Sequence, residues 1–538
     1  MARVGSIRFW LSFLFLNSAL ALHLPGQASA WSYLEPSLDV IGLCLTFVLL
    51  AAWRKRVPRP IGWAVLGYLV ASFALGMADG IEQGAYRRNF VLAVDLPLLP
   101  EFVRLFHATQ PWPLFLATCS LIVALGVGLF FAFQHALRLA LTELESPALG
   151  RALCVGVGAL ALLAAVEPAK VIFQPSRLPR WIAEIRGLYQ LPRLRVRERL
   201  RIAAADRALQ ARPRDLTALR GQNVYVFLIE SYGQSALERP ELYERIAPEY
   251  RSFERELSGA GFQIASRVLD SPVYGGRSWL AQASLLTGIV TRDQLQFELL
   301  RQAQPHTVAR AFSAAGYRSV LIQPGTVRAD SERDLLRFDQ RYTASDLGYR
   351  GPRYGWATMP DQFVIDAVRR RELSGTPARP LFLTYALVSS HIPWSALPPL
   401  VADWNAIGDG SSFERLQKKT YATSWLTLTS AEASAAYADA IAYDLAVLRH
   451  YLLEFVKDDS LVIVLGDHQP HGDITLGAAS FGVPVHVLSR RAAFVARFGA
   501  RGYTPGMVAD EALPHPGLES LLPDLLADFS QPAAPRVR

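Results

Sequence analysis

The chain has 538 residues, 51% of them hydrophobic, and its mean hydropathy is +0.19. Because this is too apolar for an ordinary soluble enzyme, we expect part of the chain to lie in lipid. Residues 174–220 contain 12 Arg, no Lys and four acidic residues. The net charge of this segment, 12 − 4 = +8, equals the formal net charge of the whole chain. The rest of the chain is neutral overall, which excludes a nucleic-acid-binding protein with a basic face.

Five apolar runs predict an α-helical membrane domain of about five spans over residues 1–173. A span needs about 20 mostly apolar residues, so the third and fourth runs fit best and the others need flanking residues. Residues 1–30 are alternatively a cleavable signal peptide, because Ala28-Ser29-Ala30 matches an A-x-A cleavage pattern. The runs cover residues 9–24, 40–53, 61–78, 112–133 and 152–166.

Basic residues in the short loops predict the orientation of these spans. With the N-terminus inside, only Arg87, Arg88 and Arg104 fall in the outer loops. Five spans then place everything after about residue 173 outside the cytoplasm, as in a multi-pass protein of the bacterial inner (plasma) membrane. The cytoplasmic side holds Arg3, Arg8, Arg54, Lys55, Arg56, Arg59, Arg138 and Arg151.

Residues 174–221 form an Arg-rich segment with helical periodicity on either side of Pro192. Two interpretations stay open for this linker. It is either an interfacial helix that touches lipid phosphates or a solvated helix between two domains.

From residue 222 the pattern predicts an α/β doubly wound domain over 222–528, followed by a disordered tail at 529–538. Short apolar runs at 223–230, 317–323, 380–390 and 460–467 are typical of strands buried on both faces, as in a parallel sheet. Residues 306–317 and 433–458 predict covering helices. Asp439 and Asp444, five residues apart on the second helix, point about 140° apart and do not form an acid/base pair.

Ligands of open α/β sheets collect beyond the carboxyl ends of the strands, where this chain places chemically active residues. Glu230 ends the first strand and is either a helix cap or a metal ligand. Asp467 and His468 end the last of the four expected strands. Gly275 and Gly276 permit a tight turn before Ser278. Ser278 is therefore either a helix N-cap or a nucleophile.

The order of these motifs resembles the alkaline phosphatase and sulfatase superfamily, and most closely its membrane-anchored branch of lipoteichoic acid synthases and phosphoglycerol or phosphoethanolamine transferases. The motif similarity covers residues 222–475, and the similarity of the spans is architectural. The resemblance implies a sulfatase-like extracytoplasmic domain with one divalent ion (Mn, Mg or Zn). It also implies that Glu230, Asp467, His468 and Ser278 are metal ligands.

The resemblance further implies that Ser278 is the nucleophile and that His391, in a His-x-Pro motif, contacts the substrate phosphate. Trp356 resembles a tryptophan that shapes the family's pocket, and Arg277 is a candidate phosphate contact. The transferases usually have Thr where this chain has Ser278. Formylglycine sulfatases carry Pro and Arg after the modified residue, whereas Trp279 to Gln282 contain neither, so that chemistry is not expected.

The expected enzyme moves a phosphoglycerol or phosphoethanolamine group from a phospholipid to an envelope glycan or lipid through a phosphoserine. The three cysteines all lie in predicted spans, and their absence from the outer domain favours phosphoglycerol over the disulfide-rich phosphoethanolamine transferases. Two alternatives are a phosphodiesterase or other ester hydrolase, and a catalytically silent lipid-binding or signalling module.

Overall fold

The chain divides into two compact units, one formed by residues 1–84 and 88–192 and the other by residues 85–87 and 193–538. The computed structural model describes residues 2–21, 35–54, 58–100, 103, 112–144, 155–156, 158–159, 162, 173–326, 335–354, 359–375, 377–416, 418–424, 427–478, 480–510 and 513–531. Ala28-Ser29-Ala30 and ten of the 15 residues of the fifth apolar run, 152–166, lie outside these ranges.

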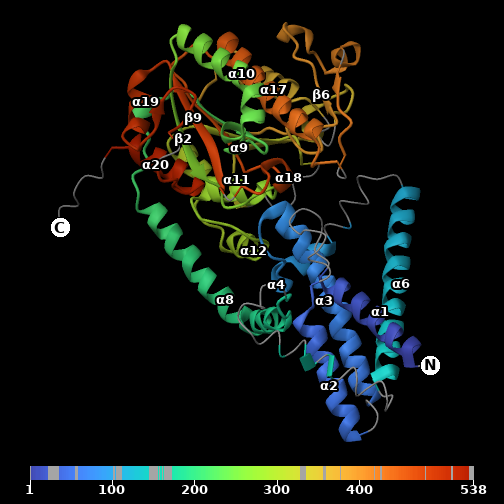
Figure 1. The fold of residues 1–538 in the computed structure, drawn as a ribbon. Coiled ribbons are helices and arrows are strands. Elements are labelled where there is room, and N and C mark those ends of the chain that lie inside the picture. The colour runs from blue at the N-terminus through green and yellow to red at the C-terminus, as the bar shows by residue number, and fades with distance from the viewer. Residues whose placement is uncertain are drawn as a thin grey trace, which may run out of the picture. The chain divides into compact units, whose positions relative to one another are not determined.

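The first unit is helical. Its main helices are α1 (Ala2–Ala21), α2 (Leu38–Arg54), α3 (Arg59–Tyr86) and α6 (Trp112–Leu144), with the short α4 (Leu92–Asp95) (Figure 1). Phe9 of α1, Leu69 of α3 and Phe133 of α6 are buried in a shared apolar core. Among the described residues, α3 and α6 are long and apolar enough to cross a membrane, so two of the five expected spans have helices of sufficient length.

The segment after the spans contains α8 (Leu178–Gln210), a 33-residue helix that continues through Pro192. Ile202 and Leu209 in its second half are buried in the core of the α/β domain. Several apolar side chains of α8 are instead exposed, although apolar residues usually lie inside a domain. These are Leu178, Ile182, Ile185, Leu188, Tyr189, Val196 and Leu200.

The second unit is built on an eight-stranded sheet, as expected for an α/β domain. Its order is β10-β2-β9-β8-β1-β5-β3-β4. The four expected strands are β1 (Val224–Ile229), β3 (Arg318–Gln323), β5 (Leu381–Ala386) and β8 (Leu461–Gly466). The others are β2 (Gln263–Asp270), β4 (Gln340–Thr343), β9 (Gly482–Ser489) and β10 (Thr504–Pro505), and β6 (Ala396–Leu397) pairs with β7 (Lys419–Thr420) in a separate ribbon.

The sheet is mixed, which corrects the expectation of a parallel sheet. β8, β1, β5, β3 and β4 are parallel neighbours, whereas β9 is antiparallel to both β8 and β2. Antiparallel neighbours need no helical crossover between them, so β9, β2 and β10 extend the sheet beyond β8 without the βαβ spacing that the sequence pattern relied on.

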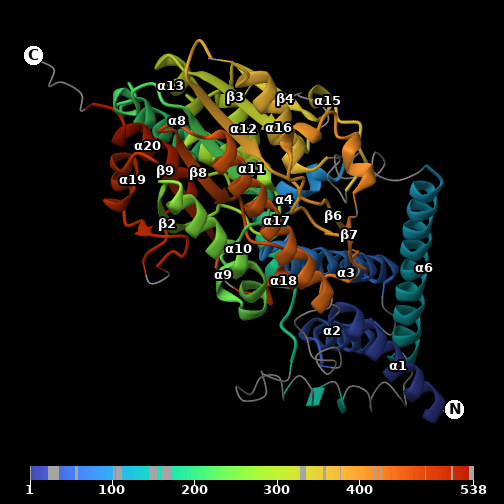
Figure 2. The ribbon, with the colours of Figure 1, turned by 90° about the horizontal axis from the view of Figure 1, so that it is seen from above.

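Helices cover both faces of this sheet. Alternate residues of β1 point to opposite faces: Phe227 lies in the core formed with α10 (Pro240–Gly259), α16 (Asp361–Glu372) and α17 (Ala431–Phe455). Val226 lies in the core formed with α11 (Ser278–Thr287), α12 (Gln294–Ala303), α13 (Val308–Ala314), α19 (Ala492–Gly499) and α20 (Leu521–Asp528). Figures 1 and 2 show α10 and α17 side by side. The two separate cores show that helices cover both faces of the sheet, as expected for a doubly wound domain.

The first residue of the expected tail, Phe529, belongs to the folded domain, whereas residues 532–538 lie outside the described residues. Phe529 is fully buried, and its carbonyl accepts a hydrogen bond from Ala218 N at 2.9 Å. The sequence FSQPAAP looks tail-like because it is short and contains two prolines, but its first residue completes the core.

Candidate active site

Parallel pairing brings the ends of β1 and β8 to the same edge of the sheet. Ile229 is in register with Gly466, so Glu230 and Asp467 follow neighbouring strands at the same level. Both residues and His468 are buried, with 7%, 2% and 1% of their surfaces exposed. The structure therefore brings together the three residues that sequence reasoning placed at the strand ends.

Ser278 is the first residue of α11, and the residue before it, Arg277, is the N-cap. Gly275 and Gly276 have φ values of 69° and 149°, and Arg277 has 65°, so the chain makes the tight turn that the glycines predicted. The Ser278 hydroxyl donates to Glu230 Oε2 at 2.9 Å and lies 3.1 Å from His468 Nε2. Its side chain faces the cluster, so the N-cap interpretation is wrong.

The three buried side chains meet closely enough to share a cation. One ligand atom from each of Glu230, Asp467 and His468 lies within 4.8 Å of the others. His468 Nε2 is 3.3 Å from Glu230 Oε1 and 3.6 Å from Asp467 Oδ2. Two carboxylates and an imidazole suit Mn²⁺, Zn²⁺ or Mg²⁺, so the donor set fits the expected divalent ion.

Hydrogen bonds behind the cluster fix the directions of the His468 and Asp467 side chains. His468 Nδ1 lies 2.7 Å from the carbonyl of Gln469, which turns Nε2 toward the carboxylates. Asp467 Oδ1 accepts hydrogen bonds from the backbone N–H of Ser231 and of His468, both at 2.8 Å. This leaves Oδ2 of Asp467 on the side of the imidazole.

The charged groups of the cluster strongly shift one another's pKa values. Burial and the charge of Glu230 raise the pKa of Asp467 to about 7. Burial opposes the charge on His468, but Asp467 and Glu230 raise its pKa to about 9. Burial likewise acts to raise the pKa of Glu230, yet the neighbouring His468 and His391 hold it below its usual range. Two buried carboxylates at this distance need a cationic partner.

His391 lies on the loop that follows β5, the other parallel neighbour of β1. Ser390 Oγ donates to the Glu230 carbonyl at 2.8 Å, which joins this loop to the metal-ligand segment. His391 Nδ1 lies 2.6 Å from the carbonyl of Ile392 and therefore carries the hydrogen, so Nε2 carries the lone pair in the neutral ring. Burial lowers the pKa of His391, which favours this neutral form.

Two buried carboxyl groups lie behind the His391 loop, of which sequence reasoning missed Asp361 and considered Asp444 only as a partner of Asp439. Asp361, the first residue of α16, accepts hydrogen bonds from Val388 N at 2.9 Å and Ser389 N at 2.6 Å. Asp444 of α17 is fully buried, and burial and Asp361 raise its pKa well above the usual range. The sequence signal for Asp444 was a carboxyl group among the apolar residues of an amphipathic helix, which predicts that this carboxyl group is buried.

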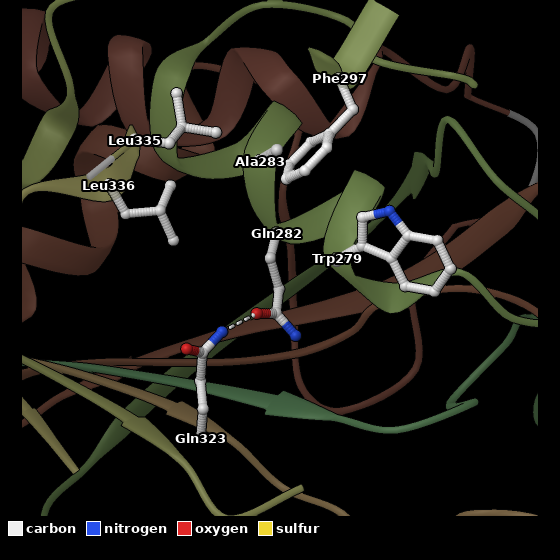
Figure 3. Close-up of a pocket in the computed structure, with 7 residues that line it drawn as sticks. All are labelled: Trp279, Gln282, Ala283, Phe297, Gln323, Leu335 and Leu336. Carbon is white, nitrogen blue, oxygen red and sulfur yellow. Dashed lines mark hydrogen bonds between the residues drawn. The ribbon is translucent and has the colours of Figure 1, made fainter. Parts of the chain in front are cut away.

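A small hollow next to Ser278 is the other feature that sequence reasoning missed. Figure 3 shows the amides of Gln282 and Gln323 end to end, with Gln323 Nε2 donating to Gln282 Oε1 at 2.7 Å. Gln323 is the last residue of β3, so the strand-end argument that found Glu230 also applies to it. The hollow is lined by Trp279, Gln282, Ala283, Phe297, Gln323, Leu335 and Leu336.

Trp356 lies outside the described residues, so its role stays a prediction. Arg277 adjoins Ser278 and shapes the turn through its backbone. Its contact with a substrate phosphate likewise stays a prediction.

Comparison with known families now identifies the domain that carries this site. The sulfatase family model matches residues 271–485. These residues form a sulfatase-family domain. The match includes Ser278, His391, Asp467 and His468, and Glu230 precedes the matched segment. The resemblance to the alkaline phosphatase and sulfatase superfamily, and with it the expectation of a sulfatase-family enzyme, is confirmed.

Solved structures similar to this chain include the integral membrane phosphoethanolamine transferase EptA from Neisseria meningitidis. It shares 14% identity at a TM-score of 0.49, with 98% of this chain and 94% of that one covered. The phosphoglycerol transferase GacH from Streptococcus pyogenes shares 13% at a TM-score of 0.37, with 62% and 92% covered. The lipoteichoic acid synthase LtaP from Listeria monocytogenes shares 13% at a TM-score of 0.34, with 50% and 65% covered.

The likeness to LtaP therefore spans less than two thirds of that chain. No curated protein matches the sequence. At these identities and TM-scores the similar structures do not identify a substrate for this chain. The substrate has to be inferred from the residues of the site.

Proposed function

We propose that this protein is a membrane-bound, metal-dependent transferase that moves a phospho-alcohol group from a phospholipid headgroup to an envelope acceptor through a phosphoserine intermediate. The observation that carries the proposal is the position of Ser278. Its hydroxyl lies within 3.1 Å of both a carboxylate and an imidazole of a buried cluster that fits a divalent ion.

Ser278 has the environment of a nucleophile. It is partly exposed, so a substrate can reach it, whereas the three residues around it are buried. It also lies at the N-terminus of α11, where the helix dipole stabilises negative charge. A divalent ion held by Glu230, Asp467 and His468 supplies Lewis-acid stabilisation of phosphate charge and of the serine alkoxide.

In the first step Ser278 Oγ attacks the phosphorus of the lipid headgroup. The bond from phosphorus to Oγ forms, and the bond from phosphorus to the diacylglycerol oxygen breaks. Ser278 releases its hydroxyl proton on the side of Glu230 Oε2, and the departing diacylglycerol oxygen takes up this one proton.

In the second step the acceptor hydroxyl attacks the phosphoserine phosphorus and the bond to Oγ breaks. The Nε2 lone pair of neutral His391 is suited to take the acceptor's proton, because Nδ1 already donates to Ile392. That proton then returns to Ser278 Oγ. Water in place of the acceptor gives the hydrolase alternative with the same residues.

A lipid donor agrees with the apolar surface of the helical unit. α6 exposes large apolar side chains along most of its length, which is typical of a helix in contact with lipid. The exposed apolar side chains of α8, interspersed with its Arg residues, favour an interfacial helix over a solvated linker. These exposed residues of α6 are Leu114, Leu116, Leu121, Ile122, Val123, Leu125, Val127 and Phe131.

The test uses the purified full-length protein with labelled phosphatidylglycerol and phosphatidylethanolamine in Mn²⁺. We expect the wild type to release diacylglycerol and Ser278→Ala to lose at least ~10³-fold in rate. Ser278→Thr keeps the hydroxyl and should retain activity. Mass spectrometry should detect phosphate on Ser278 in the wild type.

Equal release by Ser278→Ala, or no release from either lipid, contradicts the proposal. A labelled acceptor then separates transfer from hydrolysis, because only the hydrolase yields free phospho-alcohol as its final product.

A further inference from the structure

The hollow beside Ser278 has the composition of a binding site for an uncharged polar group. The hollow opens to solvent, and its enclosed part has room for a group about the size of one water molecule, such as a single hydroxyl. Phe297, Leu335 and Leu336 form a buried apolar wall, and Trp279 is about one third exposed at the rim. Figure 3 shows the two amides between these walls, with the indole of Trp279 on the side of Gln282.

Gln323 presents an acceptor atom with no hydrogen-bond partner in the part of the chain that the structure describes. The residue is 95% buried, and its Oε1 has no hydrogen-bond partner among the described residues. Its Nε2 is occupied by Gln282 Oε1. A buried amide oxygen without a partner is unfavourable, because it has lost its water without gaining a donor. A ligand hydroxyl in the hollow would satisfy it.

The amide pair lies one helical turn from the nucleophile. Ser278 and Gln282 are at positions i and i+4 of α11, which places them on the same face, about 6 Å apart along the axis. Each bond of a glycerol chain is about 1.5 Å long, so the terminal hydroxyl of a glycerol phosphate lies at a similar distance from its phosphorus. A phosphate attacked by Ser278 therefore has its alcohol within reach of Gln282.

We propose that Gln282 and Gln323 bind the hydroxyl groups of the transferred phosphoglycerol and select it over phosphoethanolamine. This inference rests on the proposed function and names its substrate. The amide pair offers the acceptor Gln323 Oε1 and the Gln282 Nε2 donor, which match a diol whose hydroxyls both donate and accept.

The same lining disfavours the ethanolamine headgroup. An ammonium ion that leaves water needs a carboxylate or several acceptors around it. None of the described lining residues is acidic, and the amide pair provides a single acceptor without a partner. The one indole at the rim is partly exposed and does not replace a counter-charge.

The experiment compares kcat/KM for diacylglycerol release from phosphatidylglycerol and phosphatidylethanolamine vesicles. The full-length wild type is compared with Gln323→Leu, Gln323→Glu and the partly exposed Gln282→Glu. Gln302→Glu, an exposed residue on α12 outside the hollow, is the matched control. Calorimetric titration of Ser278→Ala with glycerol phosphate and with phosphoethanolamine gives a readout independent of turnover.

We expect the wild type to prefer phosphatidylglycerol and the Ser278→Ala protein to bind glycerol phosphate more tightly. Gln323→Leu should lower the phosphatidylglycerol value about tenfold, the effect of one lost hydrogen bond to a buried group, and leave the other lipid unchanged. The two Glu variants should shift the ratio toward phosphatidylethanolamine by about tenfold or more, and Gln302→Glu should not shift it.

A wild type that prefers phosphatidylethanolamine, or folded variants with the wild-type ratio, overturns this inference and leaves the transferase standing. Release from neither lipid by the wild type overturns the proposed function itself. If Gln323→Leu does not fold, the ratio in Gln282→Glu decides, because that side chain is partly exposed.

Discussion

Replacing Asp444 by Asn should stabilise the α/β domain at neutral pH, although Asp444 is fully buried at the end of the sheet that carries the site. Asp361 accepts two backbone hydrogen bonds, whereas both oxygens of Asp444 lack a partner among the described residues. The proton of the pair therefore belongs on Asp444. Asn mimics the protonated carboxyl and needs no proton from solvent.

The magnitude follows from the raised pKa values of the pair. Burial raises the pKa of Asp361 from 3.8 to about 6, and burial and Asp361 raise that of Asp444 as well. A carboxyl group whose pKa is higher in the folded than in the unfolded protein stabilises the fold fully when the pH is below the unfolded-state pKa. This stabilisation is lost as the pH rises toward the folded-state pKa. For the pair, the shift of Asp361 from 3.8 to about 6 corresponds to a loss of about 3 kcal/mol between pH 4 and 6, since each pH unit contributes about 1.4 kcal/mol.

The assay is thermal unfolding of the full-length wild type and Asp444→Asn at pH 4.5 and 7.5. We expect similar Tm values at pH 4.5 and a Tm about 5–10 °C higher for the variant at pH 7.5. Asp439→Asn on the same helix is the control with the opposite sign. Burial acts to raise the pKa of Asp439, but Arg245 at 2.9 Å and Lys419 lower it, so its loss should destabilise at pH 7.5.

The same pH slope in both proteins, or a less stable Asp444→Asn at pH 7.5, would refute the assignment of a shared buried proton.

Two further substitutions test the metal cluster and the core. Glu230→Gln should weaken Mn²⁺ binding at least ~10-fold, measured by calorimetry, because one of the three clustered side chains loses its charge. Glu298→Gln on α12, which removes a carboxylate outside the cluster, is the control. His486→Leu should destabilise by ~1–3 kcal/mol at pH 7 in urea unfolding, because Ser266 at 2.7 Å and Tyr232 at 2.8 Å each lose a buried partner. Burial lowers the pKa of His486 to about 3, so the wild type loses stability as the pH falls below 6.5. His486→Leu should lose less stability over the same pH range. An equal loss of stability in acid by both proteins would count against a buried neutral His486.

The strand-end residues were predictable because local pattern and general topology agree there. Glu230, Asp467 and His468 each follow an apolar strand directly, and parallel strands present their carboxyl ends at one edge. The role of Ser278 was ambiguous from sequence, since a serine after two glycines also fits a helix cap. The structure makes Arg277 the N-cap and places the Ser278 hydroxyl 2.9 Å from Glu230, and the role of Ser278 as nucleophile stays a proposal.

The other features of the site and sheet could not be predicted, because they depend on the order and direction of the strands, which the sequence pattern does not contain. β3 lies beside β5, so Gln323 belongs to the site edge, yet a glutamine at a strand end carries no charge to mark it. Asp361 is typical of an acidic residue in a first helical turn, and its contact with the His391 loop depends on long-range packing. β9 is buried and apolar, but its antiparallel direction depends on a tertiary neighbour.

The sheet order also sets when the domain can fold. β1 is the first strand in the chain and lies in the middle of the sheet, between β5 and β8, which begin 157 and 237 residues after it. Until both arrive, its apolar run VYVFLI has two open edges, and such unpaired strands are prone to aggregate. The contact between Ala218 and Phe529 closes later still. Folding of this domain therefore waits for nearly its whole length, and a chaperone that shields residues 224–229 would act earliest in its synthesis.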